Sequence, residues 1–247
     1  MSDNAFERCV AFINCQLTPS ERARGQFKNE ACRMAVTISR QTGSGAMAIA
    51  QRLADYLQEH CPGKCEWAVF DRNLMDKVLE DHHLPKRLSK FLPEDSISGI
   101  DDMVEELFGL HPPSWTVVRQ CTETILHLAG LGNVILIGRG ANVITRNMDN
   151  VVHVRLVGSV EKRVERLQKN NNLSRAKALE FIRLSDRGRA RYLKKYFDAT
   201  AEDPLLYDLV LNTDKFSEEE AARLIGEIVF SRAQVANASR MTETKPE

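Results

Sequence analysis

The chain has 247 residues and is 43% hydrophobic, which is enough to bury a substantial core in one decorated α/β domain or in two small domains. Its 34 basic and 34 acidic side chains cancel, so the overall charge argues against a general nucleic-acid binder and against attachment to a membrane surface. Apolar runs stay well short of the about 20 residues that a membrane-spanning helix needs. The amino-terminal stretch carries charges inside its apolar part, unlike a secretory signal, and we therefore expect a cytoplasmic protein with no membrane partner.

Six cysteines are scattered along the chain. A chain of this length with a large core does not need disulfides, so we expect reduced thiols. Cys61 and Cys65 lie close together in the sequence, but no second pair of ligands accompanies them. A turn between a helix and a strand explains this pair better than a metal site does, and we predict no metal ligands.

Residues 1–33 are expected to form an appendage to the main domain. Apolar side chains recur there at helical spacing, which predicts an amphipathic helix in the first part of the segment. We expect this helix to pack on the core, on a partner or in a self-contact, and to carry no chemistry of its own. The side chains at helical spacing are Phe6, Cys9, Val10, Ile13 and Leu17.

Residues 34–230 show alternating strand and helix signals, typical of an α/β domain. Five short apolar segments separated by helical stretches predict a parallel sheet with right-handed crossovers, flanked by helices in a three-layer sandwich. In such sheets ligands bind beyond the carboxyl ends of the strands. The main candidate residues follow such ends, so we expect them to meet at one edge of the sheet. The predicted strands are 35–39, 66–70, 133–138, 151–158 and 207–213.

The segments between and after these strands differ in character. Residues 84–113 contain four prolines and are predicted to form a broken helical insertion. Residues 168–200 are strongly basic and predict a helical lid. Ser159 and Ser217 are predicted to cap the two charged helices that begin after them. Residues 231–247 are expected to form a flexible tail.

The segment RQTGSGA, from Arg40 to Ala46, joins the first strand to a helix in the manner of a phosphate-cradling loop. Small residues let backbone N–H groups approach an anion, and the start of the following helix adds partial positive charge. The alternative is a tight turn whose glycines take positive φ. The usual pattern G-x-x-x-x-G-K-[ST] has a lysine after its last glycine, where this chain has Ala46.

Two further residues directly follow predicted strands. Asp71 either contacts a substrate hydroxyl or base, or caps the next helix, and its own pattern favours the cap. Arg139 lies between two glycines after a buried strand, where an unpaired charge would be costly. Its planar guanidinium suits bidentate binding of a phosphate, and the alternative is an ion pair with a neighbouring carboxylate.

The segment RLSDRGRARYLKKYF crowds basic side chains into one helical stretch. A charge run of this kind is usually a solvated helix face. The functional interpretation is a mobile lid whose arginines close on phosphates and stabilise charge that develops during transfer. A nucleic-acid site would also contain such a run, but the neutral charge of the whole chain argues against nucleic acid as a partner. The basic residues are Arg183, Arg187, Arg189, Arg191, Lys194 and Lys195.

The motifs occur in the order ISRQTGSGA, FDRNLM, GRGANVI, VHVRLVGSVEKRVER, SDRGRARYLKKYF and DPLLYDLVLNT, and in this order they resemble the cytidylate kinase-like family. The resemblance extends over residues 34–230. It implies a P-loop kinase-type fold with a core that holds ATP, a region for a substrate monophosphate and an arginine lid. ATP and Mg²⁺ are the cofactors that it implies, with a small nucleotide such as CMP or dCMP as the acceptor.

The resemblance also carries three groups of residues over to this chain. One group lines the nucleotide phosphates, one binds the substrate, and one belongs to the lid, where the part played by each arginine stays open. The phosphate group is Gly43, Ser44 and Gly45; the substrate group is Asp71, Arg139 and Asp186; the catalytic arginines are Arg139, Arg187, Arg189 and Arg191.

The chain departs from the family's pattern in its phosphate loop. Cytidylate kinases have GSGKGT where this chain has GSGAMA, so that Ala46 replaces the lysine and Ala48 the threonine. The kinase-like branch commonly lacks the lysine as well. Since phosphoryl transfer depends on positioning and charge neutralisation, another cation can offset the loss, and the candidates are Arg40, Arg139 or a lid arginine. We therefore expect an ATP-dependent phosphotransferase, with a catalytically weak or inactive nucleotide-binding module as the alternative.

Overall fold

The computed structural model describes residues 2–17, 33–61, 65–71 and 115–243, and the statements below concern these residues. Five parallel strands form one sheet in the order β2-β3-β1-β4-β5. The predicted five-stranded parallel sheet is thereby confirmed. The strands are β1 (Ala35–Arg40), β2 (Ala68–Phe70), β3 (Val134–Ile137), β4 (Val151–Val157) and β5 (Leu209–Asn212).

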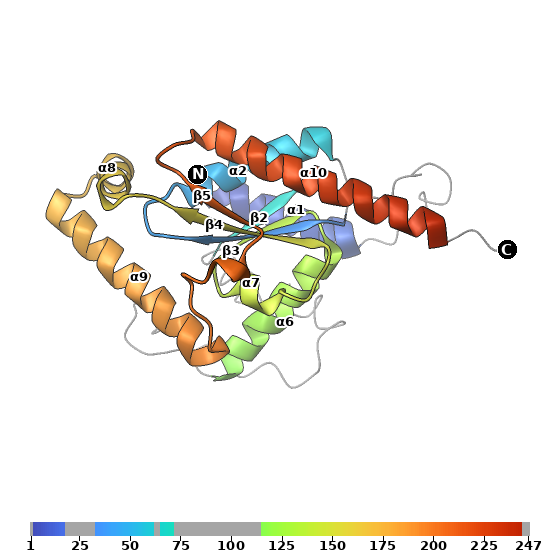
Figure 1. Ribbon diagram of the computed structural model, residues 1–247, viewed down its shortest axis with the longest axis horizontal. Helices are drawn as coiled ribbons and strands as arrows, with labels where there is room; N and C mark the ends of the chain where they lie inside the picture. Colours follow the sequence, from blue (N-terminus) through green and yellow to red (C-terminus); the bar gives the residue numbers. More distant parts are fainter. Residues whose placement is uncertain (1, 18–32, 62–64, 72–114, 244–247) are drawn as a thin grey trace.

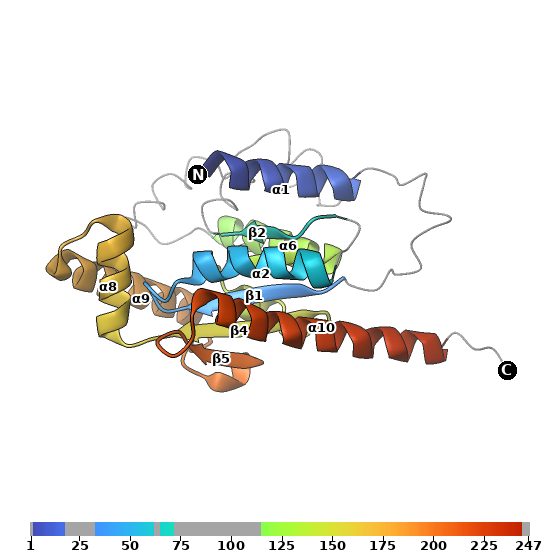
Figure 2. The same cartoon turned by 90° about the horizontal axis from the view of Figure 1, so that it is seen from above.

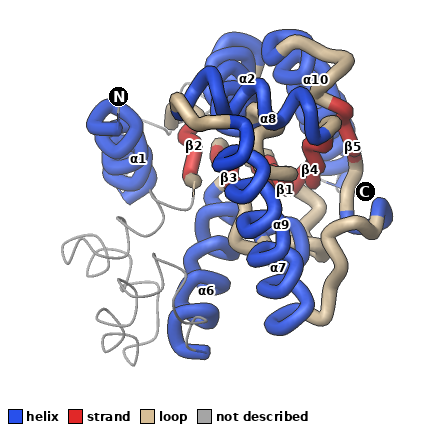
Figure 3. The backbone as a smooth tube through the Cα atoms, turned by 90° about the vertical axis from the view of Figure 1, so that its left-hand side faces the viewer, coloured by secondary structure: helices blue, strands red, loops and turns tan. Residues whose placement is uncertain are grey.

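Helices cover both faces of the sheet, so the domain has three layers (Figure 1). The helices α2 and α10 lie side by side on one face, while α6 and the short α7 lie on the other (Figure 3). Helix α1 lies beside β2, at one end of the row of strands (Figure 2). These helices are α1 (Ser2–Leu17), α2 (Ala46–His60), α6 (Trp115–Leu131), α7 (Ala141–Ile144) and α10 (Glu218–Glu243).

The alternation of side chains along the strands divides the core between the two faces. Val36 and Ile38 of β1 belong to an apolar cluster with α2 and α10. On the opposite face, Ile125 and Leu128 of α6 belong to a second apolar cluster with the other side of the sheet. Helix α1 extends this second cluster with the buried Phe12. The predicted amino-terminal helix therefore exists and packs on the core.

Two helices, α8 (Val160–Asn171) and α9 (Arg175–Phe197), stand at the carboxyl edge of the sheet, on the left of Figure 1. Ser159 caps α8 as predicted, because its side chain accepts a hydrogen bond from the Lys162 amide. Ser174 caps α9 in the same way. A short 3-10 helix, η1 (Pro204–Leu206), then leads into β5. The predicted lid segment is thus two capped helices, of which α9 is the longer.

Apolar packing anchors α9 at both ends. Near its start, Ile182 packs against Val164 of α8. Near its end, Leu193 packs against Val143 of α7. The middle of α9 therefore spans the carboxyl edge of the sheet between two fixed points.

The closing helix is longer than the sequence predicts. Ser217 and Glu220 form the expected cap at its start, each accepting a hydrogen bond from the other's amide. The helix then continues to Glu243. The expectation of a flexible tail is therefore wrong for residues 231–243, which are helical. Ala233 is still buried in the core, and the following residues are mostly good helix formers, which explains the extension.

The expectation of reduced thiols is wrong for two of the cysteines. Cys15 of α1 and Cys65 before β2 form a disulfide, with their Cα atoms 6.0 Å apart. The pairing depends on the packing of α1 beside β2, which no local sequence pattern predicts. Cys9 and Cys121 are buried and lie outside this disulfide.

Several expectations fall on parts of the chain outside the described residues. These are the insertion at 84–113, the helix predicted after Asp71 and the second half of the amino-terminal appendage. Within the described ranges, no helix is both long enough and apolar enough to cross a membrane.

Candidate active site

The loop between β1 and α2 has the backbone that its glycines predict. Gly43 and Gly45 have φ of 81° and 82°, and Gly45 directly precedes α2. A side chain on Gly43 would meet the main-chain oxygen of Arg163 in α8 at 2.6 Å. The loop thus packs directly on α8, and Gly43 is required by this close approach as well as by its φ. Ser44 between the two glycines is buried.

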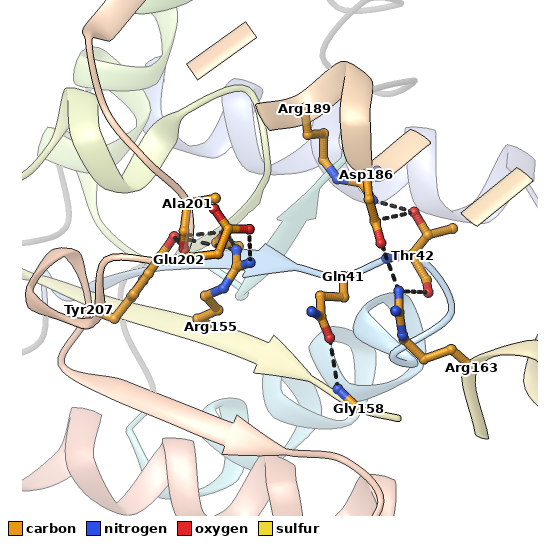
Figure 4. A network of polar contacts seen from close by, with 11 residues as sticks. Gln41, Thr42, Arg155, Gly158, Arg163, Asp186, Arg189, Ala201, Glu202 and Tyr207 are labelled. Carbon is orange, nitrogen blue, oxygen red and sulfur yellow. Dashed lines mark hydrogen bonds and ion pairs between the residues drawn. The ribbon is translucent and has the colours of Figure 1, made fainter. Parts of the chain in front are cut away.

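Thr42, at the start of the loop, and Asp186, in the middle of α9, form the centre of a polar network (Figure 4). One carboxylate oxygen of Asp186 accepts hydrogen bonds from the Thr42 amide at 2.9 Å and from the Thr42 hydroxyl at 2.8 Å. The same oxygen accepts a hydrogen bond from Arg189. The other oxygen accepts one from Arg163 at 2.7 Å. Donors from the loop, α8 and α9 therefore surround a single carboxylate.

This network keeps the Asp186 carboxylate ionised. Burial acts to raise the pKa of Asp186, but hydrogen bonds from Thr42 and Arg163 and the charge of Arg189 outweigh it, so the pKa lies below its ordinary value. Burial lowers the pKa of Arg189, an effect that Asp186 opposes and that the charges of Arg155 and Arg163 reinforce. Arg155 and Arg163 thus each lie close enough to repel Arg189, an arrangement suited to binding anions.

The spacing along α9 decides which predicted lid residues reach the loop. Asp186 and Arg189 are three residues apart, so they share the helix face that contacts Thr42. Arg187 and Arg191 project from other sides of the helix and are exposed. Of the four predicted lid residues, the structure therefore brings two to the loop and leaves Arg187 and Arg191 outside the network.

A second polar cluster lies beside the first (Figure 4). Arg155 of β4 is buried, donates a 3.0 Å hydrogen bond to the Ser39 hydroxyl and forms a 3.4 Å ion pair with Glu202. Its guanidinium lies 5.6 Å from the ring centre of Tyr207. The Tyr207 hydroxyl in turn donates to the Ala201 carbonyl at 2.9 Å. These neighbours satisfy a charge that would otherwise be costly within a buried strand.

Arg40, the last residue of β1, lies with its guanidinium against Gly138 at the end of β3. A Cβ atom on Gly138 would lie 1.9 Å from Nη1 of Arg40, so the glycine leaves the room that this cation occupies. Strands β1 and β3 are neighbours in the sheet. The predicted substitute cation therefore lies across the carboxyl edge, between the loop and the turn that follows β3.

Arg139 lies in that turn, within three consecutive residues of positive φ. The angles are 85° at Gly138, 52° at Arg139 and 72° at Gly140. A left-handed conformation costs a non-glycine residue about 1–2 kcal/mol, and such strain clusters at functional sites. A Cβ atom on Gly140 would lie 2.9 Å from the ring of Phe197, so the end of α9 covers the turn. Arg139 is thus held at the carboxyl edge by a strained and enclosed backbone.

Asp71 lies at the same edge but apart from the loop, because β3 separates β2 from β1. Burial and the charge of Asp71 raise the pKa of Cys9 in α1 to about 12, so the carboxylate lies near that thiol. The helix that Asp71 would cap is outside the described residues. Both roles considered for Asp71 stay predictions.

The positions of the missing lysine and threonine carry no cation or hydroxyl. Ala46 packs beside the main apolar cluster, and Met47 is 38% exposed. Cations from α8 and α9 contact the loop instead. They are Arg163, Arg166 and Arg189.

Sequence reasoning missed Thr42, Arg155 and Arg163. A usable signal existed for the two arginines, because Arg155 interrupts an apolar strand and Arg163 falls on the apolar side of α8. Charged side chains at buried positions need polar partners. Thr42 carried no such signal, since its partners Asp186 and Arg163 lie 144 and 121 residues away in the sequence.

Comparison with known sequences gives a match to one family model. The model of the cytidylate kinase-like family matches residues 35–215, which contain the whole sheet, α8 and α9. A cytidylate kinase from Pyrococcus horikoshii is 24% identical over 216 residues, which cover 85% of this chain and 96% of that protein. A uronate isomerase from Corynebacterium glutamicum is 31% identical over 111 residues, 45% of this chain, but the match spans only 21% of the isomerase.

Among solved structures, an uncharacterized protein from Eubacterium ventriosum ATCC 27560 aligns with a TM-score of 0.60. The alignment covers 81% of this chain and 99% of that chain at 18% sequence identity. At this identity the likeness shows the fold alone. Together with the match to the family model and the observed parallel sheet, it confirms the predicted P-loop kinase-type sandwich.

Proposed function

Because the chain belongs to the cytidylate kinase-like family, we propose that it is an ATP-dependent phosphotransferase of the nucleoside monophosphate kinase type. The acceptor that we propose is CMP or dCMP. The relative from Pyrococcus horikoshii, a cytidylate kinase matched over nearly its whole length, supports this choice.

The observation that carries the proposal is the gathering of arginines around a phosphate loop that lacks its lysine. They come from four elements, and their guanidinium groups lie at one edge of the sheet. Guanidinium forks bind phosphate oxygens in pairs, and several of them can neutralise a polyphosphate without an ammonium group. The four arginines are Arg40 of β1, Arg155 of β4, Arg163 of α8 and Arg189 of α9.

In the proposed reaction, an oxygen of the acceptor monophosphate attacks the γ-phosphorus of ATP. One P–O bond forms, the bond to the β,γ-bridging oxygen breaks, and ADP leaves with the electron pair. The acceptor oxygen is already ionised, so the chain need not supply a general base. We assign Arg139 to the acceptor phosphate, the loop and Arg163 to the phosphates of ATP, and Arg189 to the charge that develops during transfer.

Magnesium fits this site through the phosphates rather than through the chain. Mg²⁺ usually keeps several water ligands and binds substrate phosphates, with only one or two protein carboxylates. The described residues include no group of three His, Cys, Asp or Glu side chains that could hold a metal ion. We propose that Mg²⁺ arrives with ATP and neutralises part of its charge.

The direct test is to incubate the purified protein with ATP, Mg²⁺ and a panel of nucleoside monophosphates. We expect a nucleoside diphosphate to form from CMP or dCMP. Arg139→Ala should lower the rate by roughly a hundred- to a thousandfold, by analogy with the loss of one preorganised donor. Arg175→Ala, an exposed residue at the start of α9, is the matched control. No diphosphate above background from any monophosphate would contradict the proposal.

A second candidate is a nucleotide-binding module without turnover. The loop itself favours this candidate, because Ala46, Met47 and Ala48 offer no cation or hydroxyl, and the Thr42 amide already binds the chain's own Asp186. Calorimetry with ATP and CMP separates the two candidates. Binding without diphosphate formation supports the module, whereas turnover that is lost in Arg139→Ala supports the enzyme.

A further inference from the structure

The contact between Asp186 and the phosphate loop has the form of a bound anion. A phosphate at such a loop accepts hydrogen bonds from main-chain N–H, hydroxyl and guanidinium groups. The Asp186 carboxylate accepts from all three kinds. Its donors are the Thr42 amide, the Thr42 hydroxyl and the guanidinium groups of Arg163 and Arg189, which we call the Thr42 cradle.

Most of the Thr42 cradle does not depend on α9. Thr42 belongs to the loop, and Arg163 comes from the first turn of α8 with a side chain that is only 6% exposed. Arg163 also donates to the Thr42 carbonyl at 3.3 Å, and Gly43 packs against its main chain. Three of the four donors therefore stay together when Asp186 is removed, and only Arg189 shares its helix.

The middle of α9, by contrast, meets the loop through polar contacts. Its apolar anchors lie toward the two ends, around Ile182 and Leu193. Between them, a Cβ atom on Gly188 would meet no atom of another described element within 4 Å, and a glycine in a helix interior weakens the helix. Release of Asp186 from the loop would therefore break polar contacts and leave both apolar anchors intact.

We propose that Asp186 is an internal cap on a phosphate subsite, and that a phosphate group of the nucleotide replaces it in the Thr42 cradle. The inference rests on the proposed function for the identity of the ligand, a nucleotide. It adds that the Asp186 carboxylate must leave the Thr42 cradle before a phosphate binds there. A phosphate presents more oxygens and more negative charge than a carboxylate to the same donors, so it competes well for them. The cap keeps the loop and α9 together without nucleotide and reduces the apparent affinity for it.

The experiment uses inorganic tripolyphosphate as the probe, because it offers phosphates without a base or a sugar. Titration calorimetry on the full chain should show that Asp186→Asn binds tripolyphosphate about tenfold more tightly than the natural protein. Adding Arg163→Gln to Asp186→Asn should remove this gain. The matched control is Glu202→Gln, which removes a carboxylate that pairs with Arg155 beside the same site, and its gain should stay below about threefold.

Unchanged or weaker binding by Asp186→Asn would overturn the inference, and so would an equal gain in Glu202→Gln, which would reveal a general effect of charge. Asp186→Ser must give the same gain as Asp186→Asn. If neither variant folds, the natural protein is titrated and the amide resonance of Thr42 is followed by NMR. That resonance must move as its acceptor changes from carboxylate to phosphate, and a resonance that stays in place overturns the inference.

The outcome is separable from that of the kinase proposal. If a diphosphate forms but Asp186→Asn gains no affinity for tripolyphosphate, only the internal-cap proposal is contradicted. If Asp186→Asn gains affinity but no diphosphate forms, only the kinase proposal is contradicted, and Asp186 is the cap of a binding site.

Discussion

Two regions of the molecule hold a helix against the sheet by different means. At the β2 end, α1 is fixed by buried apolar side chains such as Phe12 and by the disulfide between Cys15 and Cys65. At the carboxyl edge, the centre of α9 is held by the ion pairs and hydrogen bonds of Asp186 and Arg189. A dissolved anion can take the place of the Asp186 carboxylate. No solute can take the place of the buried apolar contacts of α1, and its disulfide opens only in a reductant. The attachment of α1 is therefore permanent, and that of α9 is exchangeable.

The largest effect is expected at Gly43, where the phosphate loop beside the exchangeable attachment packs directly on α8. Alanine there would have to keep a φ of 81°, which costs about 1–2 kcal/mol. Its Cβ atom would lie 2.6 Å from the main-chain oxygen of Arg163, and relieving such overpacking costs about 1–3 kcal/mol more. Urea denaturation should show this loss in the free energy of unfolding. Gly130→Ala in α6 is the control, expected to gain up to about 1 kcal/mol because nothing lies near its Cβ position. Equal stability of the two variants would contradict the close approach of loop and helix.

The permanent attachment is tested by Cys15→Ser. The disulfide joins residues 50 positions apart, and its loss should lower the free energy of unfolding by about 2–4 kcal/mol. Affinity for ATP should change by less than about twofold, since distant sites act independently. The stability difference should disappear when both proteins unfold in a reductant that opens the disulfide. A large drop in ATP affinity would show that the two regions are coupled.

Arg163→Gln tests whether one guanidinium group both stabilises the contact with Asp186 and binds a phosphate. The substitution removes a charged donor from a carboxylate whose side chain is 30% exposed, so we expect unfolding to become easier by about 1–3 kcal/mol. Affinity for ATP should fall about tenfold, because the same guanidinium would bind a phosphate. Denaturation and calorimetry measure the two effects, and the exposed Arg175→Gln should change stability by less than about 0.5 kcal/mol. A loss of stability without any loss of ATP affinity would make Arg163 purely structural.

The smallest effect is expected at Gly188, in the middle of α9. Alanine fits there without contact and should stabilise the helix by about 0.5–1 kcal/mol. Because the central segment would then open less often, hydrogen exchange of residues 186–190 should slow, while exchange in α1 should not change. Faster or unaltered exchange would argue against a weak point between the two anchors of α9.

Local patterns in the sequence predicted the sheet and the edge of it at which candidate residues meet. Apolar runs marked the strands, and the rule that ligands bind beyond carboxyl ends predicted that Gly43, Asp71 and Arg139 lie at one edge. Once the contact of Asp186 with the loop is known, helical spacing places Arg189 on the same face of α9 and Arg187 on another.

What the patterns could not supply is the partner of each side chain. Nothing near Thr42 in the sequence indicates that Asp186 binds its amide, because packing across more than a hundred residues brings them together. The pairing of Cys15 with Cys65 depends in the same way on where α1 packs. The sequence underestimates the length of α10, because its polar last segment resembles a frayed end although its helix propensity is high.

The position of α1 also determines how the sheet can be extended. It lies along the outer side of β2, where the Cys9 thiol donates a 3.4 Å hydrogen bond to the Val69 carbonyl. At the opposite end, β5 pairs only with β4 within the described ranges, and its Val210 is 46% exposed. Since an added strand needs an uncovered row of main-chain groups, we expect a further strand, whether in assembly or in aggregation, to join the sheet at β5 rather than at β2.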